Sequence, residues 1–127
     1  MAEDRRLHPP EAQPWPTELK LSKDRRHLTV AFDDGLRFEL PAELLRVLSP
    51  SAEVQGHSPE QRVTVAGKKN VGILTIEPVG NYAVRIVFDD THDTGLYVWA
   101  YLRELGEHRE ARWQDYLQDL AAKKLTR

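Results

Sequence analysis

The sequence predicts an α+β fold, with a small, mostly antiparallel sheet built from two hairpin-helix units and an additional C-terminal helix. Two observations favour this class. Short segments in which apolar and polar residues alternate are separated by Asp, Asn and Gly, as in antiparallel hairpins. In addition, the order of strand, Asp-rich turn, strand and short helix occurs twice, in residues 28–48 and again from residue 80 onward.

The composition limits the classes of function. A chain of 127 residues with 40% hydrophobic content suits one compact domain. A net charge of -2 with interspersed charges argues against a nucleic-acid or anionic-membrane partner, because phosphate binding needs a positive surface. The absence of cysteine excludes thiolate metal sites and thiol nucleophiles. With no apolar run long enough to span a bilayer and no signal peptide, we expect a cytoplasmic protein.

Residues 1–16 are predicted to be a mobile N-terminal segment. Several prolines stand there among charged residues, and such a composition buries too little apolar surface to offset the entropy of ordering. Trp15 is the one large apolar side chain of this segment. We expect it to fold back on the domain edge, with partner binding as the alternative.

The first unit is predicted from its alternation of apolar residues. Leu19 and Leu21 begin a strand, residues 28–32 form a second, and residues 36–40 form a third after an Asp-Asp-Gly turn. A short helix then starts at Pro41, because proline suits the first helical turn, and it ends near Ser49.

The second unit repeats this order. Residues 61–65 read as a short strand, residues 71–76 as another, and residues 82–88 as the strongest strand of the chain. A return strand over residues 95–98 brings the total to about six or seven strands. Trp99 opens a helix as a core residue, and Gly106 is predicted to stop it.

Residues 107–127 are predicted to form an amphipathic helix, since apolar and aromatic residues recur there at helical spacing. We expect its aromatic face to pack on the domain. The alternative is a helix that docks a partner or pairs two protomers.

The turn of residues 89–93 is the densest collection of metal-donor side chains. Adjacent residues in a turn rarely converge on one centre, so the simpler interpretation is that the aspartates bind backbone amides and His92 is exposed. No phosphate-binding loop or nucleophile elbow is present, and no general acid/base pair stands out. We therefore expect a protein that is not an enzyme.

Several motifs together resemble the gamma-butyrobetaine hydroxylase-like N-terminal domain family, a small module of unknown function. The resemblance covers about residues 17–106. It rests on Phe32-Asp33-Asp34-Gly35, Leu40–Arg46, Ser49–His57, Val71-Gly72-Ile73, Glu77–Val84 and His92–Tyr97 with Trp99.

The resemblance implies a module that precedes a 2-oxoglutarate dioxygenase domain in some hydroxylases and follows the ATPase domain of some P-loop iron-sulfur cluster carriers. Many bacteria have it alone, and this chain resembles that stand-alone form. With neither an oxygenase domain nor a P-loop in the sequence, neither activity transfers to it.

The resemblance also implies a zinc site. In the hydroxylases three cysteines and a histidine hold the metal, and their positions fall here on Ser49, Ser51, Val54 and His92. Because the three thiolates are absent, we expect that zinc site to be lost, with no certain cofactor. A weaker zinc or iron site at His92 with Asp89, Asp90 or Asp93, and His57, is the alternative.

These observations lead to one main functional hypothesis, a non-catalytic protein-interaction module linked to iron-sulfur cluster assembly or iron handling. An iron-sulfur cluster carrier ATPase is the expected partner. The alternatives are a metal-binding protein that uses the His92 turn and an accessory domain that acts with a separate 2-oxoglutarate dioxygenase.

Overall fold

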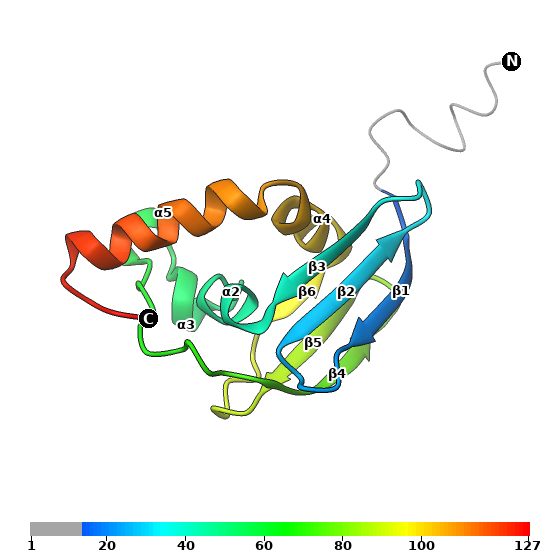
Figure 1. Ribbon diagram of the computed structural model, residues 1–127, viewed down its shortest axis with the longest axis horizontal. Helices are drawn as coiled ribbons and strands as arrows, with labels where there is room; N and C mark the ends of the chain where they lie inside the picture. The colour runs from blue at the N-terminus through cyan, green and yellow to red at the C-terminus, as the bar shows by residue number, and fades with distance from the viewer. Residues whose placement is uncertain (1–13) are drawn as a thin grey trace, which may run out of the picture.

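The computed structural model describes residues 14–127, with only the backbone of residue 59. The strands divide between two three-stranded antiparallel sheets, and helices pack beside them (Figure 1), which confirms the α+β class. The elements in order are β1 (Pro16–Leu21), β2 (His27–Phe32), β3 (Arg37–Pro41), α2 (Ala42–Val47), α3 (Ala52–Gln55), the 3₁₀ turn η1 (Pro59–Gln61), β4 (Ile73–Val79), β5 (Ala83–Phe88), β6 (Leu96–Val98), α4 (Trp99–Glu107) and α5 (Arg109–Ala122).

The first sheet has the order β1-β2-β3, with Leu28 of β2 opposite Leu21 on one side and Leu40 on the other. The alternation seen in the sequence gives this sheet one buried face, since Leu28, Val30 and Phe32 are almost fully buried. Its hairpins match the predicted strands. Gly35 supplies the positive φ of 90° that the β2–β3 turn requires.

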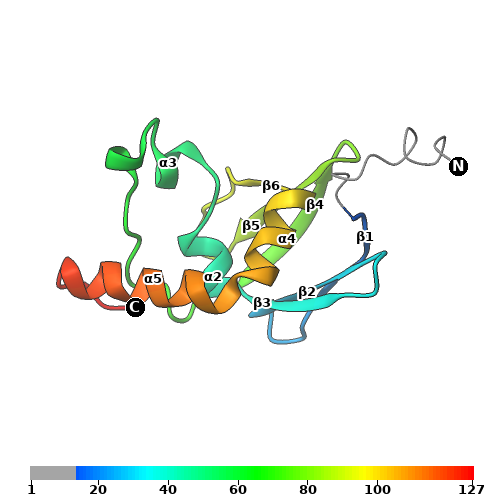
Figure 2. The same ribbon diagram turned by 90° about the horizontal axis from the view of Figure 1, so that it is seen from above.

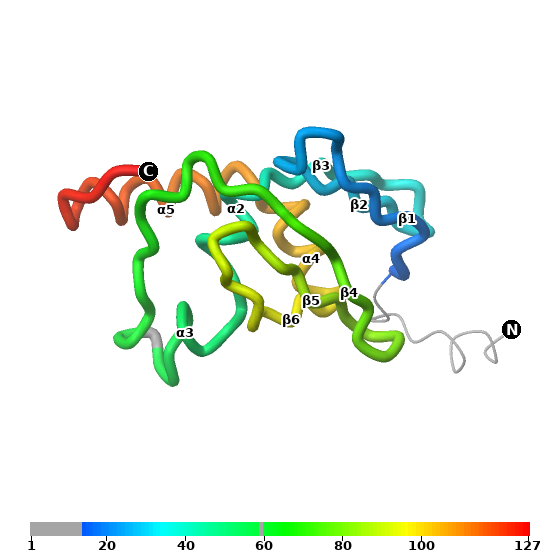
Figure 3. Tube along the Cα trace, turned by 90° about the horizontal axis from the view of Figure 1, so that it is seen from below, coloured from blue at the N-terminus to red at the C-terminus, as the bar shows by residue number. Residues whose placement is uncertain are grey.

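The second sheet has the order β4-β5-β6, so β4 and β6 are its edges. Pro78 lies inside β4, opposite Val84, so the strand continues past residue 76, where the sequence predicted its end. Proline is tolerated there because an edge strand need not use every amide in the ladder. The sequence predicted one sheet, whereas the structure has two, because each set of three strands pairs only with its neighbours in the chain. A long connection separates the two sets (Figure 3).

The hydrophobic core lies between the two sheets and the helices α2 and α4 (Figure 2). Leu45 of α2, Ile86 of β5 and Leu102 of α4 are fully buried in it. Trp99 is only half-buried at its margin, where the indole N–H donates to the carbonyl of Asn81 at 3.0 Å. The core therefore joins both units into one body.

Helix α5 packs on the domain. Tyr116 and Leu120 are both 4% exposed and form a small cluster with Val47 of α2. The Tyr116 hydroxyl donates to the carbonyl of Val65 at 2.6 Å, which holds the connecting segment against the helix. The expectation that the aromatic face of this helix contacts the domain is met by these contacts.

Two local predictions are wrong. Residues 61–65 form no strand, because η1 occupies the start of the segment and Val63 is 51% exposed, with its amide bound to the carbonyl of Val54. Gly106 does not stop α4 but lies inside it. A Cβ at residue 106 would lie 2.5 Å from Cγ of Phe38, so this glycine is required by close packing.

At the N-terminus, residues 1–13 of the predicted mobile segment lie outside the described residues. Trp15 is described, and its carbonyl accepts a hydrogen bond from the amide of Asp33 at 2.8 Å. The backbone of Trp15 is therefore bound to the first hairpin turn, while the residue as a whole is 53% exposed.

The two hairpin-helix units are joined by a crossed pair of ion pairs. Arg103, on the helix of the second unit, donates to both carboxylate oxygens of Asp34 in the first turn, at 3.1 and 2.7 Å. Arg46, on the helix of the first unit, donates to Asp90 in the second turn at 2.8 Å. Each arginine thus binds the second aspartate of the other unit's Phe-Asp-Asp turn.

Candidate functional site

Ser49, Ser51 and His92 meet in a buried polar group that we call the Ser–His cluster. Nε2 of His92 lies 2.9 Å from the Ser49 hydroxyl and 3.4 Å from the Ser51 hydroxyl. Ser49 is 0%, Ser51 6% and His92 8% exposed. The interpretation of His92 as an exposed turn residue is therefore wrong.

The backbone around the cluster fixes these side chains. Ser49 follows Leu48, the residue that caps the end of α2, and its carbonyl accepts from the Gln55 side chain at 2.9 Å. His92 lies in the β5–β6 turn, where its amide donates to Asp90 at 3.1 Å. A Cβ at Gly95 would lie 2.5 Å from the Ser49 hydroxyl, so glycine is needed for the turn to approach the serine.

Electrostatics keep one member of the turn charged and the other neutral. Burial opposes ionisation of Asp90, but Lys68, the His92 amide and Arg46 outweigh it and lower its pKa to about 2. Burial, and then the positive charge of Arg46, lower the pKa of His92 below its usual value of 6.5. At neutral pH the imidazole is therefore uncharged.

Glu53 of α3 adds a carboxylate at the rim. One of its oxygens lies 3.3 Å from Nδ1 of His92 and accepts from the Thr94 hydroxyl at 2.6 Å. A neutral imidazole that donates from Nδ1 to Glu53 can accept at Nε2 from the Ser49 hydroxyl.

This order of serine, histidine and carboxylate is the one that hydrolases use. The Ser49 hydroxyl, however, has no exposed surface, and neither it nor His92 lines any of four cavities on the described residues. A nucleophile needs its substrate within about 3–3.5 Å. The arrangement as it stands therefore supports a structural hydrogen-bond network.

The cluster does not fit a structural zinc ion. Of the four positions at which the resemblance implies zinc ligands, three do come together, at Ser49, Ser51 and His92, but two of them carry hydroxyls in place of thiolates. The fourth, Val54, is buried and has no donor side chain. A structural zinc normally needs four N or S ligands.

The alternative metal ligands are also not assembled. Asp90 is bound to Arg46 and Lys68, at 2.8 and 2.6 Å. His57 is exposed, and its amide donates to the Gln61 side chain. Within residues 14–127, no group of three or more His, Asp or Glu side chains is placed to hold a metal ion.

The sequence pointed to these four positions only through the resemblance. A direct signal is present in retrospect, because Gly95 follows the turn that contains His92, and serine hydroxyls flank Pro50. Neither feature predicts burial on its own, since the contact joins segments more than forty residues apart.

Comparison with known proteins tests the resemblance. The profile of the gamma-butyrobetaine hydroxylase-like, N-terminal family matches residues 19–103. The chain belongs to this family. The match spans both hairpin-helix units and all four positions of the Ser–His cluster region, Ser49, Ser51, Val54 and His92.

Solved structures that are similar to this chain agree with the family match. A solution NMR structure is 51% identical with a TM-score of 0.79, covering 94% of this chain and 89% of the other. A second is 45% identical with a TM-score of 0.77, covering 90% of each chain. A crystal structure of an Acidithiobacillus ferrooxidans protein of unknown function from the DUF971 family is 36% identical, with a TM-score of 0.59, covering 72% of this chain and 91% of the other.

No match is found among functionally curated proteins. In the part of the chain from residue 14 onward, no helix combines the length and apolar character needed to cross a bilayer.

Proposed function

We propose that this protein is a non-catalytic cytoplasmic module that binds a protein partner through the outer face of its second sheet. The register places Val79, Val87, Leu96 and Val98 on that face, opposite the core. Leu96 is 41% and Val98 39% exposed. This partly exposed apolar face is the observation that carries the proposal.

The first sheet provides an internal comparison. The outer face of β1-β2-β3 is mostly polar, as expected for a solvated sheet, and carries Lys20, Thr29, Arg37 and Glu39. The outer face of the second sheet has one ion pair, Arg85 with Glu77, and one further polar residue, Thr75; its other members are apolar: Val79, Ala83, Val87, Leu96 and Val98. Since the two sheets belong to similar units, the difference points to a surface that a partner covers.

The partner that we propose is a component of iron-sulfur cluster assembly or iron handling, and specifically a P-loop iron-sulfur cluster carrier ATPase. Support comes from the family context, in which the same module is fused to such an ATPase. Where the module and the ATPase are separate chains, a contact between them would take the place of the fusion, and an exposed apolar face with a central ion pair can supply such a contact.

A two-dimensional amide NMR titration with a purified carrier ATPase tests the proposal. We expect saturable shifts over β4, β5 and β6, and their loss in Leu96→Asp. The matched control is Thr29→Asp, on the outer face of the first sheet, which should bind as the wild type does. Absence of saturable shifts at high carrier concentration, or equal loss in both variants, would contradict the proposal.

The same titration distinguishes the alternatives. Binding to a separate 2-oxoglutarate dioxygenase in place of the carrier would indicate an accessory-domain role. Saturable shifts with Zn²⁺ or Fe²⁺ alone, centred on His92, would favour the metal-binding alternative.

A further inference from the structure

A second site lies away from the apolar sheet face, where α2 begins beneath α5. Glu43, in the first turn of α2, is only 6% exposed. Its two carboxylate oxygens accept from Nε and Nη2 of Arg127 at 3.0 and 2.8 Å. The same guanidinium lies 5.2 Å from the ring centroid of Trp113 on α5. We call Glu43, Trp113 and Pro41 the arginine pocket.

The chemistry of this pocket selects a guanidinium. A carboxylate buried to this degree is costly without a partner, and among the described residues Arg127 is the only side chain that donates to Glu43. Two parallel N–H donors match the two carboxylate oxygens, and the planar cation also suits the face of an indole. A lysine ammonium supplies neither the fork nor the flat face.

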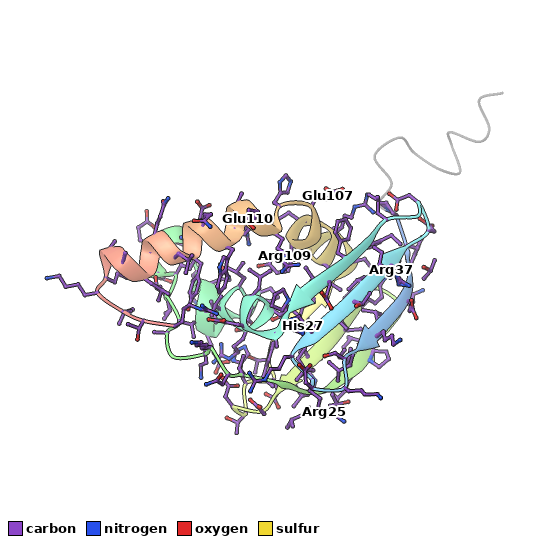
Figure 4. The ribbon with its side chains drawn as sticks, viewed as in Figure 1. Arg25, His27, Arg37, Glu107, Arg109 and Glu110 are labelled. Atoms are coloured by element: carbon purple, nitrogen blue, oxygen red, sulfur yellow. The ribbon has the colours of Figure 1, made fainter. Side chains whose placement is uncertain are left out.

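The space around Arg127 exceeds what its own side chain fills. One cavity of about 230 Å³ is lined by Glu43, Trp113 and Arg127, and a second of about 210 Å³ by Glu43, Lys69 and Arg127. Pro41, Glu43 and Arg127 line both cavities. Figure 4 shows two residues of their rims, Arg109 and His27, near the junction of β3 and α2.

The segment that carries Arg127 lies at the surface, beyond the end of α5. All residues from Ala121 to Arg127 are exposed. Beyond the helix the amides of Lys123, Lys124 and Leu125 donate to carbonyls of its last turn, and the amide of Gly67 donates to the Thr126 carbonyl at 3.1 Å. The Arg127 side chain itself is 42% exposed. Glu43 and Trp113 of the arginine pocket thus lie on helices, whereas Arg127 lies beyond the end of the last helix.

We infer that the arginine pocket is a recognition site for an arginine side chain of a protein partner, and that Arg127 occupies it as an intramolecular stand-in. Its present occupant, Arg127, defines the ligand chemistry, a guanidinium bound to Glu43 and stacked on Trp113. The inference does not rest on the outer face of the second sheet. Loss of binding there leaves the arginine pocket unaffected, and the reverse also holds.

The test uses the full chain with Arg127→Ala and the probe N-acetyl-arginine-N-methylamide, followed by amide and indole NMR shifts. We expect saturable shifts at Glu43 and the Trp113 indole, with an affinity at least about tenfold higher than for the wild type, because the tethered Arg127 competes at a millimolar or higher effective concentration. The matched probe N-acetyl-lysine-N-methylamide should bind more weakly.

Two further variants keep the test decisive. Glu43→Gln in the Arg127→Ala background should abolish saturation, and Trp113→Leu in that background should weaken binding about three- to tenfold through the lost cation–π contact. Dispersed amide spectra establish that each variant is folded. Equal affinity of wild type and Arg127→Ala, or no saturable shift at Trp113 in Arg127→Ala, would overturn the inference. So would a wild-type dimer, seen by sedimentation, that Arg127→Ala dissolves, because the pocket would then serve a second copy of this chain.

Discussion

Replacing Arg46 with methionine tests whether the ion pair beside the Ser–His cluster stabilises the fold. Arg46 and Asp90 have side chains that are 12% and 17% exposed, and Nε lies 2.8 Å from the carboxylate. Breaking a buried pair costs about 3–5 kcal/mol. Asp90 retains Lys68 at 2.6 Å, so we expect Arg46→Met to lower the free energy of unfolding by about 2–3 kcal/mol.

The pH dependence of this loss follows from the Asp90 pKa. The carboxyl has a pKa of about 2 in the folded protein against its usual value of 3.8, so its charge stabilises the fold above pH 3.8 and this contribution is lost as the pH falls toward about 2. That contribution amounts to roughly 2 kcal/mol. Removing Arg46 moves the pKa of Asp90 back toward 3.8, so the difference between wild type and variant should shrink on acidification.

Urea unfolding followed by tryptophan fluorescence, at pH 7 and again at pH 3, measures both effects. The matched control is Arg37→Met, since Arg37 pairs with Glu18 at 2.8 Å but the two side chains are 56% and 44% exposed. That variant should lose less than about 1 kcal/mol. If Arg46→Met loses no more than Arg37→Met at pH 7, the pair does not stabilise the fold as argued.

Three further predictions concern other parts of the molecule. Gly106→Ala should lower the free energy of unfolding in urea by about 1–2 kcal/mol, despite the higher helix propensity of alanine, because the new Cβ would meet the Phe38 ring. Adding Phe38→Leu to that variant should recover part of the loss. A gain in stability on Gly106→Ala would be inconsistent with the close contact between residues 106 and 38. Trp99→Ala should lose about 2–3 kcal/mol, below the 3–5 of a fully buried aromatic, because Trp99 is half-buried; a loss under about 1 would place it outside the core. A variant with cysteine at Ser49, Ser51 and Val54 should bind Zn²⁺ together with His92 and unfold at higher temperature with the metal, and an unchanged melting temperature would show that the four positions do not converge.

Much of the fold could be predicted from the sequence because its signals are local. Alternation located the strands, and Asp-Asp-Gly with Pro41 located the first turn and helix. The local signals failed where a distant contact decides the conformation. Gly106 resembles a helix stop, and only its contact with Phe38 shows why glycine is needed in the last turn of α4.

The candidate site could be predicted less well, for the same physical reason. Burial of His92 depends on a turn that folds against the end of α2, and nothing in residues 89–94 alone specifies that approach. Glu43 is a similar case, because in the sequence it is one charged residue of an amphipathic helix. Its burial and its pairing with Arg127 depend on α5 and the segment beyond it.

The crossed ion pairs bear on how the chain can be divided. Asp34 and Arg46 belong to the first half, while their partners Arg103 and Asp90 belong to the second. A cut in the connection between the halves separates both of these ion pairs and leaves each fragment with an open side of the shared core. We expect two such fragments to regain structure when they are mixed, because each supplies core surface and ion-pair partners that the other lacks. In the uncut chain the two halves are covalently joined, so dilution cannot separate them.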